Sequence, residues 1–104
     1  MQNVQLLIHG QSVNSSSAQT FERISPIDGT VASVASAATL EDVDQAIESA
    51  HRAFDIWSKL SPTERRLRLL KAADLMDQKT EQFIQIGMRE TGSTATWYGF
   101  NVHL

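Results

Sequence analysis

The side chains that could carry out acid–base or metal chemistry are few and scattered along the chain. His9, His51 and His103 have no second histidine four residues away and no carboxylate at the spacing of a metal site. The sequence has no cysteine, which excludes disulfides, cysteine-ligated zinc and a cysteine nucleophile within these 104 residues. We therefore predict no metal site, and we expect His51 to lie at the solvated rim of a helix.

Motifs for nucleophilic or phosphate chemistry are also missing. None of the serines stands in a G-x-S-x-G elbow, and neither G-x-G-x-x-G nor G-x-x-x-x-G-K-[ST] occurs. The basic run at residues 64–71 interleaves with apolar positions and lacks aromatic residues, so it favours surface or interdomain ion pairs. One group of acids follows the polar positions of a predicted helix, which is typical of a solvated face: Asp42, Asp44, Glu48 and Asp55. The residues thus predict no catalytic and no cofactor-binding side chain.

Composition narrows the class of protein further. Twelve acids against nine bases give a net charge of −3, whereas nucleic-acid binding needs a basic surface, so no nucleic-acid partner is expected. The N-terminus lacks the basic region of a signal peptide, and no stretch approaches the roughly 20 apolar residues of a membrane span. We therefore expect no membrane partner and a cytoplasmic protein, with 41% hydrophobic residues and one domain's worth of length.

Residues 1–36 are predicted to be β-rich. Residues 4–8 and 11–14 are typical of two short strands joined at His9-Gly10, where glycine supplies the positive φ of a tight hairpin turn. Residues 20–24 and 30–36 continue the extended pattern, with a turn at Pro26 and Asp28-Gly29 between them. Because an isolated hairpin is marginal in water, the first one must lie against another part of the protein.

Residues 37–104 are predicted to be helical. The first helix runs from about residue 40 to 58, with Thr39 as its N-cap. The second opens at Ser61, with Pro62 in the first helical position and Glu64 able to reach back to the cap. Apolar residues of the first helix recur at steps of three and four and form one stripe: Val43, Ala46, Ile47, Ala50, Ala53, Phe54 and Trp57.

The sequence pattern alone does not decide the secondary structure at the end of the chain. We expect Thr80 to cap a third helix that closes at Gly92, and Ser93 or Thr94 to cap whatever follows. The final residues, WYGFNVHL, fit two patterns. Trp97 and Phe100 share a helical face, and alternate residues from 98 to 104 equally fit a strand.

The order and spacing of these signals resemble the N-terminal part of the aldehyde dehydrogenase family. The similar stretches are "LLIHGQSV", "SPIDGTVASVASAATLEDVDQAIESAHRAFDIW", "LSPTERRLRLLKAADLMDQKTEQF" and "RETGST". The resemblance covers nearly the whole chain. The terminal "TWYGFNVHL" is most similar to members that oxidise aromatic aldehydes of the salicylaldehyde and vanillin type.

The resemblance implies an α/β, aldehyde-dehydrogenase-like fold of which this chain is the N-terminal portion. That portion comprises a β-hairpin and strands followed by three to four helices of the cofactor-binding domain, without the catalytic domain. Such enzymes oxidise an aldehyde to its acid with NAD or NADP, and full-length members are expected to be homo-oligomers. Their cysteine nucleophile, glutamate base, oxyanion asparagine and cofactor-contacting motifs belong to later parts, so the chain alone is expected to be inactive and to bind no cofactor.

The same resemblance favours a helix at the end of the chain and implies that the sequence stops partway along this helix. It places Trp97, Phe100 and Asn101 near the aldehyde entry tunnel, and ordinary packing against the rest of the domain is the alternative. A different class of function also remains open. The chain could be a free-standing helical protein-interaction module that binds through "WYGF", or a non-catalytic relic.

A third expectation is that the chain folds only marginally by itself. Its apolar stripes would then lack the sheet that they are meant to cover. The side chains expected to be exposed in that case are Phe54, Trp57, Leu70 and Trp97.

Overall fold

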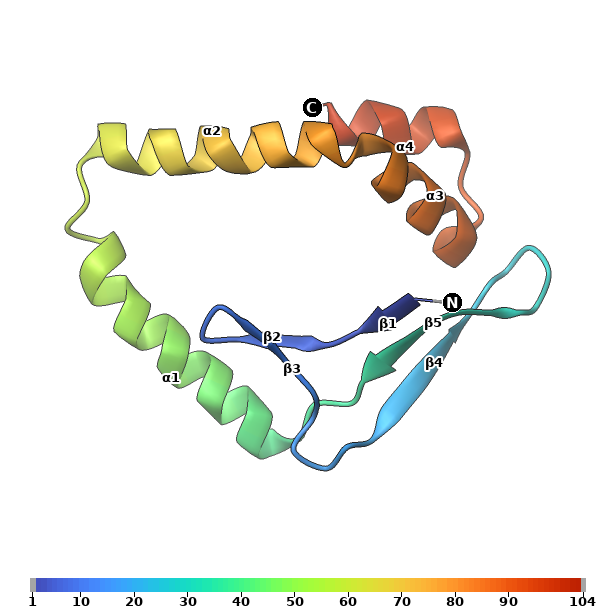
Figure 1. Ribbon diagram of the computed structural model, residues 1–104, viewed down its shortest axis with the longest axis horizontal. Coiled ribbons are helices and arrows are strands. Elements are labelled where there is room, and N and C mark those ends of the chain that lie inside the picture. Colours follow the sequence, from blue (N-terminus) through green and yellow to red (C-terminus); the bar gives the residue numbers. More distant parts are fainter. Residues whose placement is uncertain (1, 104) are drawn as a thin grey trace. The chain divides into compact units, whose positions relative to one another are not determined.

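The computed structural model describes residues 2–103 and is of the α/β class (Figure 1). Contacts divide the chain into two compact units. One unit holds the residues up to Arg23 together with Val31–Leu60, and the other holds Ile24–Thr30 together with the residues from Ser61 onwards. The strands come first in the sequence and the helices follow.

The first unit contains the strands. They are β1 (Gln2–Val4), β2 (Leu6–Ile8), β3 (Gln11–Val13), β4 (Thr20–Ile24, whose last residue lies in the second unit) and β5 (Val31–Ser36). β5 lies in the middle of a three-stranded sheet of order β1-β5-β4, and it pairs in parallel with β1, with Asn3 opposite Val34. This pairing was not predicted, because it joins segments about 30 residues apart that carry no local signal for each other.

β2 and β3 form the predicted hairpin. They pair antiparallel with Leu7 opposite Ser12, and both turn residues have positive φ, 54° at His9 and 72° at Gly10. The predicted first strand over residues 4–8 is divided at Gln5, because Val4 pairs with Ala35 in the other sheet. The hairpin lies against helix α1, as its marginal stability requires, and the imidazole Nδ1 of His9 lies 3.3 Å from the Ser49 hydroxyl oxygen.

Helix α1 (Leu40–Trp57) begins where the sequence predicted. The Thr39 hydroxyl accepts a hydrogen bond from the amide of Asp42, and the Asp42 carboxylate accepts one from the amide of Thr39. The same buried carboxylate also accepts hydrogen bonds from the Ser15 hydroxyl at 3.1 Å and from the Ser16 amide at 3.2 Å. Asp42 therefore caps the helix and ties the loop after β3 to it.

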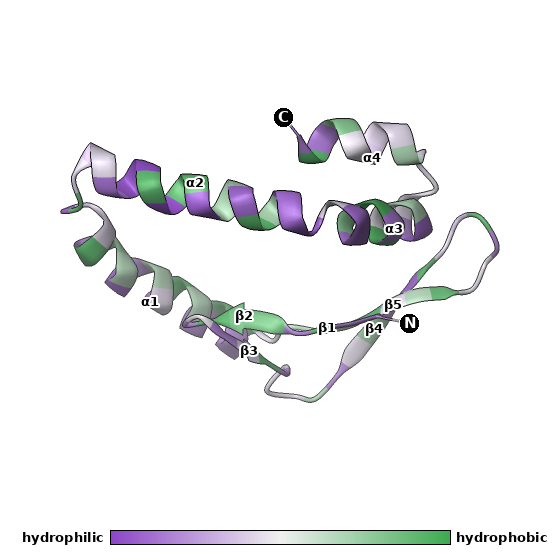
Figure 2. Cartoon of the chain, turned by 45° about the horizontal axis from the view of Figure 1, so that its top comes forward, coloured by the Kyte–Doolittle hydropathy of each residue, from purple (hydrophilic) through white to green (hydrophobic). Residues whose placement is uncertain are grey.

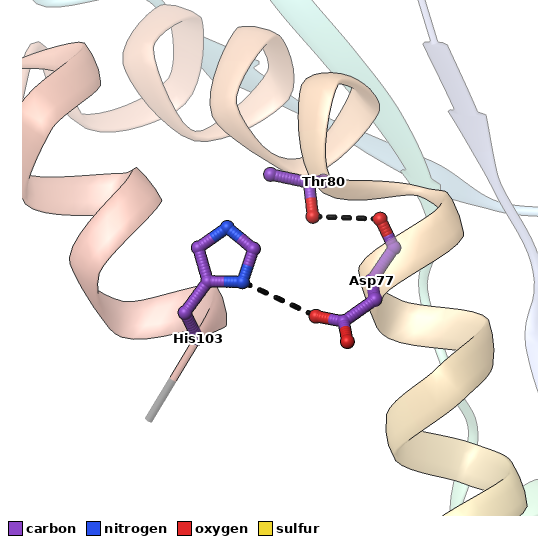
Figure 3. A network of polar contacts seen from close by, with 3 residues as sticks. All are labelled: Asp77, Thr80 and His103. Atoms are coloured by element: carbon purple, nitrogen blue, oxygen red, sulfur yellow. Dashed lines mark hydrogen bonds and ion pairs between the residues drawn. The ribbon is translucent and has the colours of Figure 1, made fainter.

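In the second unit, helix α2 (Pro62–Gln78) is capped by Ser61 and Glu64 in the predicted reciprocal arrangement. Helix α3 (Thr80–Thr91) follows almost without interruption, and the prediction that Thr80 caps it is wrong. Lys79 holds the cap position without a side-chain hydrogen bond. Thr80 is already helical, and its hydroxyl donates to the carbonyl oxygen of Asp77 at 2.8 Å (Figure 3).

Gly92 ends α3 as predicted, in the left-handed conformation with a φ of 73°. The turn at residues 25–30 packs there, since a Cβ built on Gly92 would lie 3.3 Å from Cγ of Pro26. Thr30 donates to Asp28 from both its amide and its hydroxyl, and these bonds lower the pKa of Asp28. The final element is helix α4 (Ala95–Val102). A helix is thus present where the hydrophobic period alone left helix and strand open.

Large apolar side chains are largely exposed. Within residues 2–103, Ala32 is the only buried apolar residue, and no large side chain in that range is fully buried. Hydrophobic residues recur along the helices (Figure 2), but Ile47 and Phe54 of the α1 stripe are each 63% exposed. The four residues expected to be exposed are so: Phe54, Trp57, Leu70 and Trp97. The helices therefore carry apolar faces that the described residues do not cover.

Candidate functional site

The candidate site is the outer face of α4. Phe100 and Asn101 come three and four residues after Trp97, which places the three residues on one side of a helix. Trp97 and Phe100 are 58% and 59% exposed, and the amide nitrogen of Asn101 donates to the carbonyl oxygen of Trp97 at 2.7 Å. The structure thus brings the three predicted residues together on a surface that faces away from α3.

The opposite face of α4 packs on α3 through two glycines. A Cβ built on Gly87 would lie only 2.2 Å from the ring of Tyr98, so this ring lies directly against the bare backbone of α3. At Gly99 the contact is looser, because a built Cβ would lie 3.8 Å from Cδ1 of Ile84. Gly87 and Tyr98 therefore set how closely the two helices approach each other.

The Tyr98 hydroxyl is held as well. It lies 2.9 Å from the hydroxyl oxygen of Thr91, and the Thr91 hydroxyl lies 3.0 Å from the carbonyl oxygen of Gly87. From the sequence alone, Gly87 was assigned no role of its own. A glycine inside a helical pattern costs about 1 kcal/mol relative to alanine, and this cost was the available signal for a close contact.

Both ends of α4 are fixed by side chains. At the start, the Thr94 hydroxyl accepts a hydrogen bond from the Trp97 amide at 3.2 Å, so of the two predicted caps Thr94 is the one used. At the end, Nδ1 of His103 lies 3.2 Å from a carboxylate oxygen of Asp77 (Figure 3). Both of these side chains are 60% exposed, so their pairing orients α4 more than it stabilises it.

The remaining polar groups of the described residues form no metal site. Among residues 2–103, no three histidine, aspartate or glutamate side chains come close enough to hold a metal ion. His9 and His103 lie in different units, and His51 is exposed on α1. No helix in the described range combines the length and the hydropathy of a membrane span.

The N-termini of α1 and α2 do not fit the pyrophosphate of a dinucleotide. Carboxylates already occupy the starts of α1 and α2, where Asp42 and Glu64 accept backbone hydrogen bonds. The Thr39 amide is the largest cause that lowers the pKa of Asp42 to about 2, and the Ser61 amide likewise lowers that of Glu64. Such fixed negative charges repel phosphate at these positions. That no residue of this chain binds the cofactor stays a prediction.

Comparison with known proteins decides the family. The sequence model of the aldehyde dehydrogenase family matches residues 12–103, which is most of the chain. The chain belongs to the aldehyde dehydrogenase family.

Individual relatives within this family match the chain over its length. It is 48% identical over 104 residues to a vanillin dehydrogenase of Pseudomonas sp. strain HR199, covering all of this chain and 21% of that protein. Its structure superposes with a TM-score of 0.95 on that of a salicylaldehyde dehydrogenase from Pseudomonas putida G7, which was solved in complex with salicylaldehyde. The two sequences are 41% identical, and the match covers 99% of this chain and 21% of that one.

A third relative is an NAD-dependent aldehyde dehydrogenase of Sinorhizobium meliloti. The match has a TM-score of 0.94 and 30% identity, and it covers 98% of this chain and 21% of that one. The chain thus spans about a fifth of the length of the aldehyde dehydrogenases that it matches. Its fold is that of the corresponding part of these enzymes.

Proposed function

We propose that the chain forms the N-terminal part of the cofactor-binding domain of an enzyme that oxidises an aromatic aldehyde to its carboxylic acid with NAD or NADP. The observation that carries this proposal is the 48% identity to a vanillin dehydrogenase over every residue of the chain. The salicylaldehyde complex among the structural relatives supports an aromatic substrate, and the NAD-dependent relative supports a nicotinamide cofactor. The cofactor supplies a hydride acceptor when bound.

The residues of this chain act in the proposal as a scaffold and as one wall of the aldehyde tunnel. Trp97 and Phe100 present aromatic surface from α4, which suits the flat, apolar ring of an aromatic aldehyde. Asn101 adds an amide beside them on the same face. Their exposure supports a role in lining a tunnel, because packing against α3 is carried by the opposite face of the helix.

The chemical step lies outside these residues. The sequence has no cysteine, and the one described contact of a histidine with a hydroxyl group, between His9 and Ser49 at 3.3 Å, is exposed at the surface of the first unit and far along the sequence from α4. The 104-residue chain alone is therefore expected to be inactive, and the whole enzyme is expected to be cytoplasmic and homo-oligomeric. The alternative of a free-standing interaction module is not favoured, because the relatives that match the whole chain are aldehyde dehydrogenases.

The reading frame beyond the codon of Leu104 tests the proposal. We expect it to continue for several hundred codons and to encode a later cysteine and glutamate. The full-length product should reduce NAD or NADP with vanillin or salicylaldehyde, and the 104-residue chain should not. A stop codon directly after Leu104, or a full-length product inactive on aromatic aldehydes, would contradict the proposal.

A further inference from the structure

We propose that Gly87, Tyr98 and Thr91 form a specificity-determining support for α4. This support sets where Trp97, Phe100 and Asn101 meet the aldehyde. The inference rests on the proposed function, since it concerns the same face of α4. In it, Gly87 and Tyr98 are positioning residues that act through the helix and do not touch the substrate.

The first step is the fit of the Tyr98 ring on Gly87. A Cβ at position 87 would lie 2.2 Å from both Cε1 and Cζ of the ring, far inside any real contact distance. Every residue other than glycine at this position must therefore displace the ring. Because Tyr98 belongs to α4, is half-buried and is held at its hydroxyl by Thr91, displacing the ring shifts or tilts the helix.

The second step is the hydroxyl group. Its 2.9 Å contact with the Thr91 hydroxyl fixes how far the ring reaches across α3. Thr91 is itself held to the Gly87 carbonyl oxygen, so the three residues form a closed arrangement. The ring is thus fixed both in its distance from α3 and along it.

The third step links the support to the outer face. Tyr98, Gly99 and Val102 are half-buried on the side of α3, whereas Trp97, Phe100 and Asn101 are exposed on the other side. At 3.6 residues per turn the two sets lie on roughly opposite sides of one short, rigid helix. A shift at Tyr98 therefore moves all three outer side chains together.

The consequence concerns the choice of substrate. A displacement of about 1 Å in a positioning element can change a rate constant about a hundredfold, and a planar ring tolerates it less well than a flexible chain does. Loss of the support should therefore lower kcat/KM for benzaldehyde more than for butanal. The ratio of the two values is the relevant readout, because a general loss of folded protein lowers both equally.

The test uses the full-length enzyme with Gly87→Ala and the matched control Gly99→Ala. Both substitutions place a methyl group inside a helix at the same interface, but only the first meets the Tyr98 ring, since the second has an ordinary 3.8 Å contact. We expect Gly87→Ala to lower the benzaldehyde-to-butanal ratio about tenfold. Gly99→Ala should leave the ratio unchanged.

A double substitution shows whether the effect passes through the ring. In a Tyr98→Ala background the clash is absent, so adding Gly87→Ala should change the ratio no further. If Gly87→Ala fails to fold, Tyr98→Phe takes its place, because it keeps the ring and removes only the contact with Thr91. Tyr98→Phe should lower the ratio by a smaller factor, about threefold.

Failure of this inference differs from failure of the proposed function. If Trp97→Ala changes the ratio but Gly87→Ala and Tyr98→Phe do not, the support is not specificity-determining, and the tunnel assignment stands. If Trp97→Ala and Phe100→Ala also leave the ratio unchanged, the outer face of α4 does not meet the aldehyde. Both the assignment and the inference are then overturned.

Discussion

At the scale of single residues, Asp42 has the most strongly shifted pKa among the described residues. Its carboxylate accepts hydrogen bonds from the amides of Thr39 and Ser16 and from the Ser15 hydroxyl. The Thr39 bond makes the largest contribution, and the pKa falls from 3.8 to about 2. A lowered pKa means that the charged form stabilises the folded state. This stabilisation is fully present above pH 3.8 and is lost as the pH falls towards 2.

The pH dependence that Asp42 gives to the start of α1 can be tested on a synthetic peptide of residues 37–60. This peptide keeps the hydrogen bonds between Thr39 and Asp42. Its helical content, followed by circular dichroism, should fall as the pH is lowered through the range from about 4 to about 2. Asp42→Asn should remove most of this pH dependence and lower the helical content near neutral pH.

Asp44→Asn is the matched control for Asp42→Asn. Asp44 lies on the same helix but is exposed and takes no part in the capping box. The control peptide should keep the pH dependence of the native one. An equal loss in both peptides would show that the effect is the general charge of the helix and not the cap.

Single residues also show where sequence reasoning stops. The sequence predicted Thr39, Ser61 and Gly92 as helix boundaries, and it offered Thr94 as one of two candidate caps, because a cap depends on side chains within three residues of the backbone that they serve. The contact of Gly87 with Tyr98 joins two helices across a turn. Nothing in the types of neighbouring residues specifies which ring covers which glycine.

At the scale of elements, the helices were predictable and the sheet pairing was not. Each predicted helix is present, and the one wrong cap, Thr80, lies where α2 passes into α3 with a single intervening residue. The strands were placed nearly correctly, but the parallel pairing of β1 with β5 had to be seen in the structure. Parallel partners are joined through long connections, so no short motif marks them.

The Ser61 cap supports a prediction about α2. Ser61→Ala removes the hydroxyl that accepts from the Glu64 amide at 3.2 Å, which costs about 1 kcal/mol of helix stability. In the full-length enzyme, hydrogen exchange of the first-turn amides of α2 should become about fivefold faster, as expected for that free energy.

Thr63→Ala serves as the control for the Ser61 cap. It removes an exposed hydroxyl from the same turn that takes no part in the capping box. Exchange in this variant should remain within about twofold of the native rate. If Ser61→Ala leaves the exchange unchanged, the start of α2 is held by contacts other than its cap.

At the scale of the whole molecule, the chain exposes more surface than a self-contained protein of its size. Two separate compact units, each of half the 11.5 kDa mass, would expose about 7,000 Å² together, whereas this chain exposes 7936 Å². The apolar helix faces contribute to this excess, including Ile47 and Phe54 of the α1 stripe, which are each 63% exposed. Contiguous apolar surface of this kind marks a face that other protein covers.

The uncovered faces agree with a chain that spans about a fifth of its relatives' length. Capping boxes and turn residues specify the elements locally, so the helices and the hairpin form in the right places. The free energy that holds a domain together comes mainly from burial of apolar area, and these residues bury little of it. We therefore expect the elements to be stable only when further protein packs on them.

The most direct test of this account is the thermal unfolding of the 104-residue chain, measured at several concentrations together with its mass by analytical ultracentrifugation. We predict self-association that increases with concentration and a broad, shallow transition in circular dichroism. A monomer with one sharp, concentration-independent melting transition would show that the chain has a sufficient core of its own. That result would contradict the claim that its helices form the outer layer of a larger enzyme.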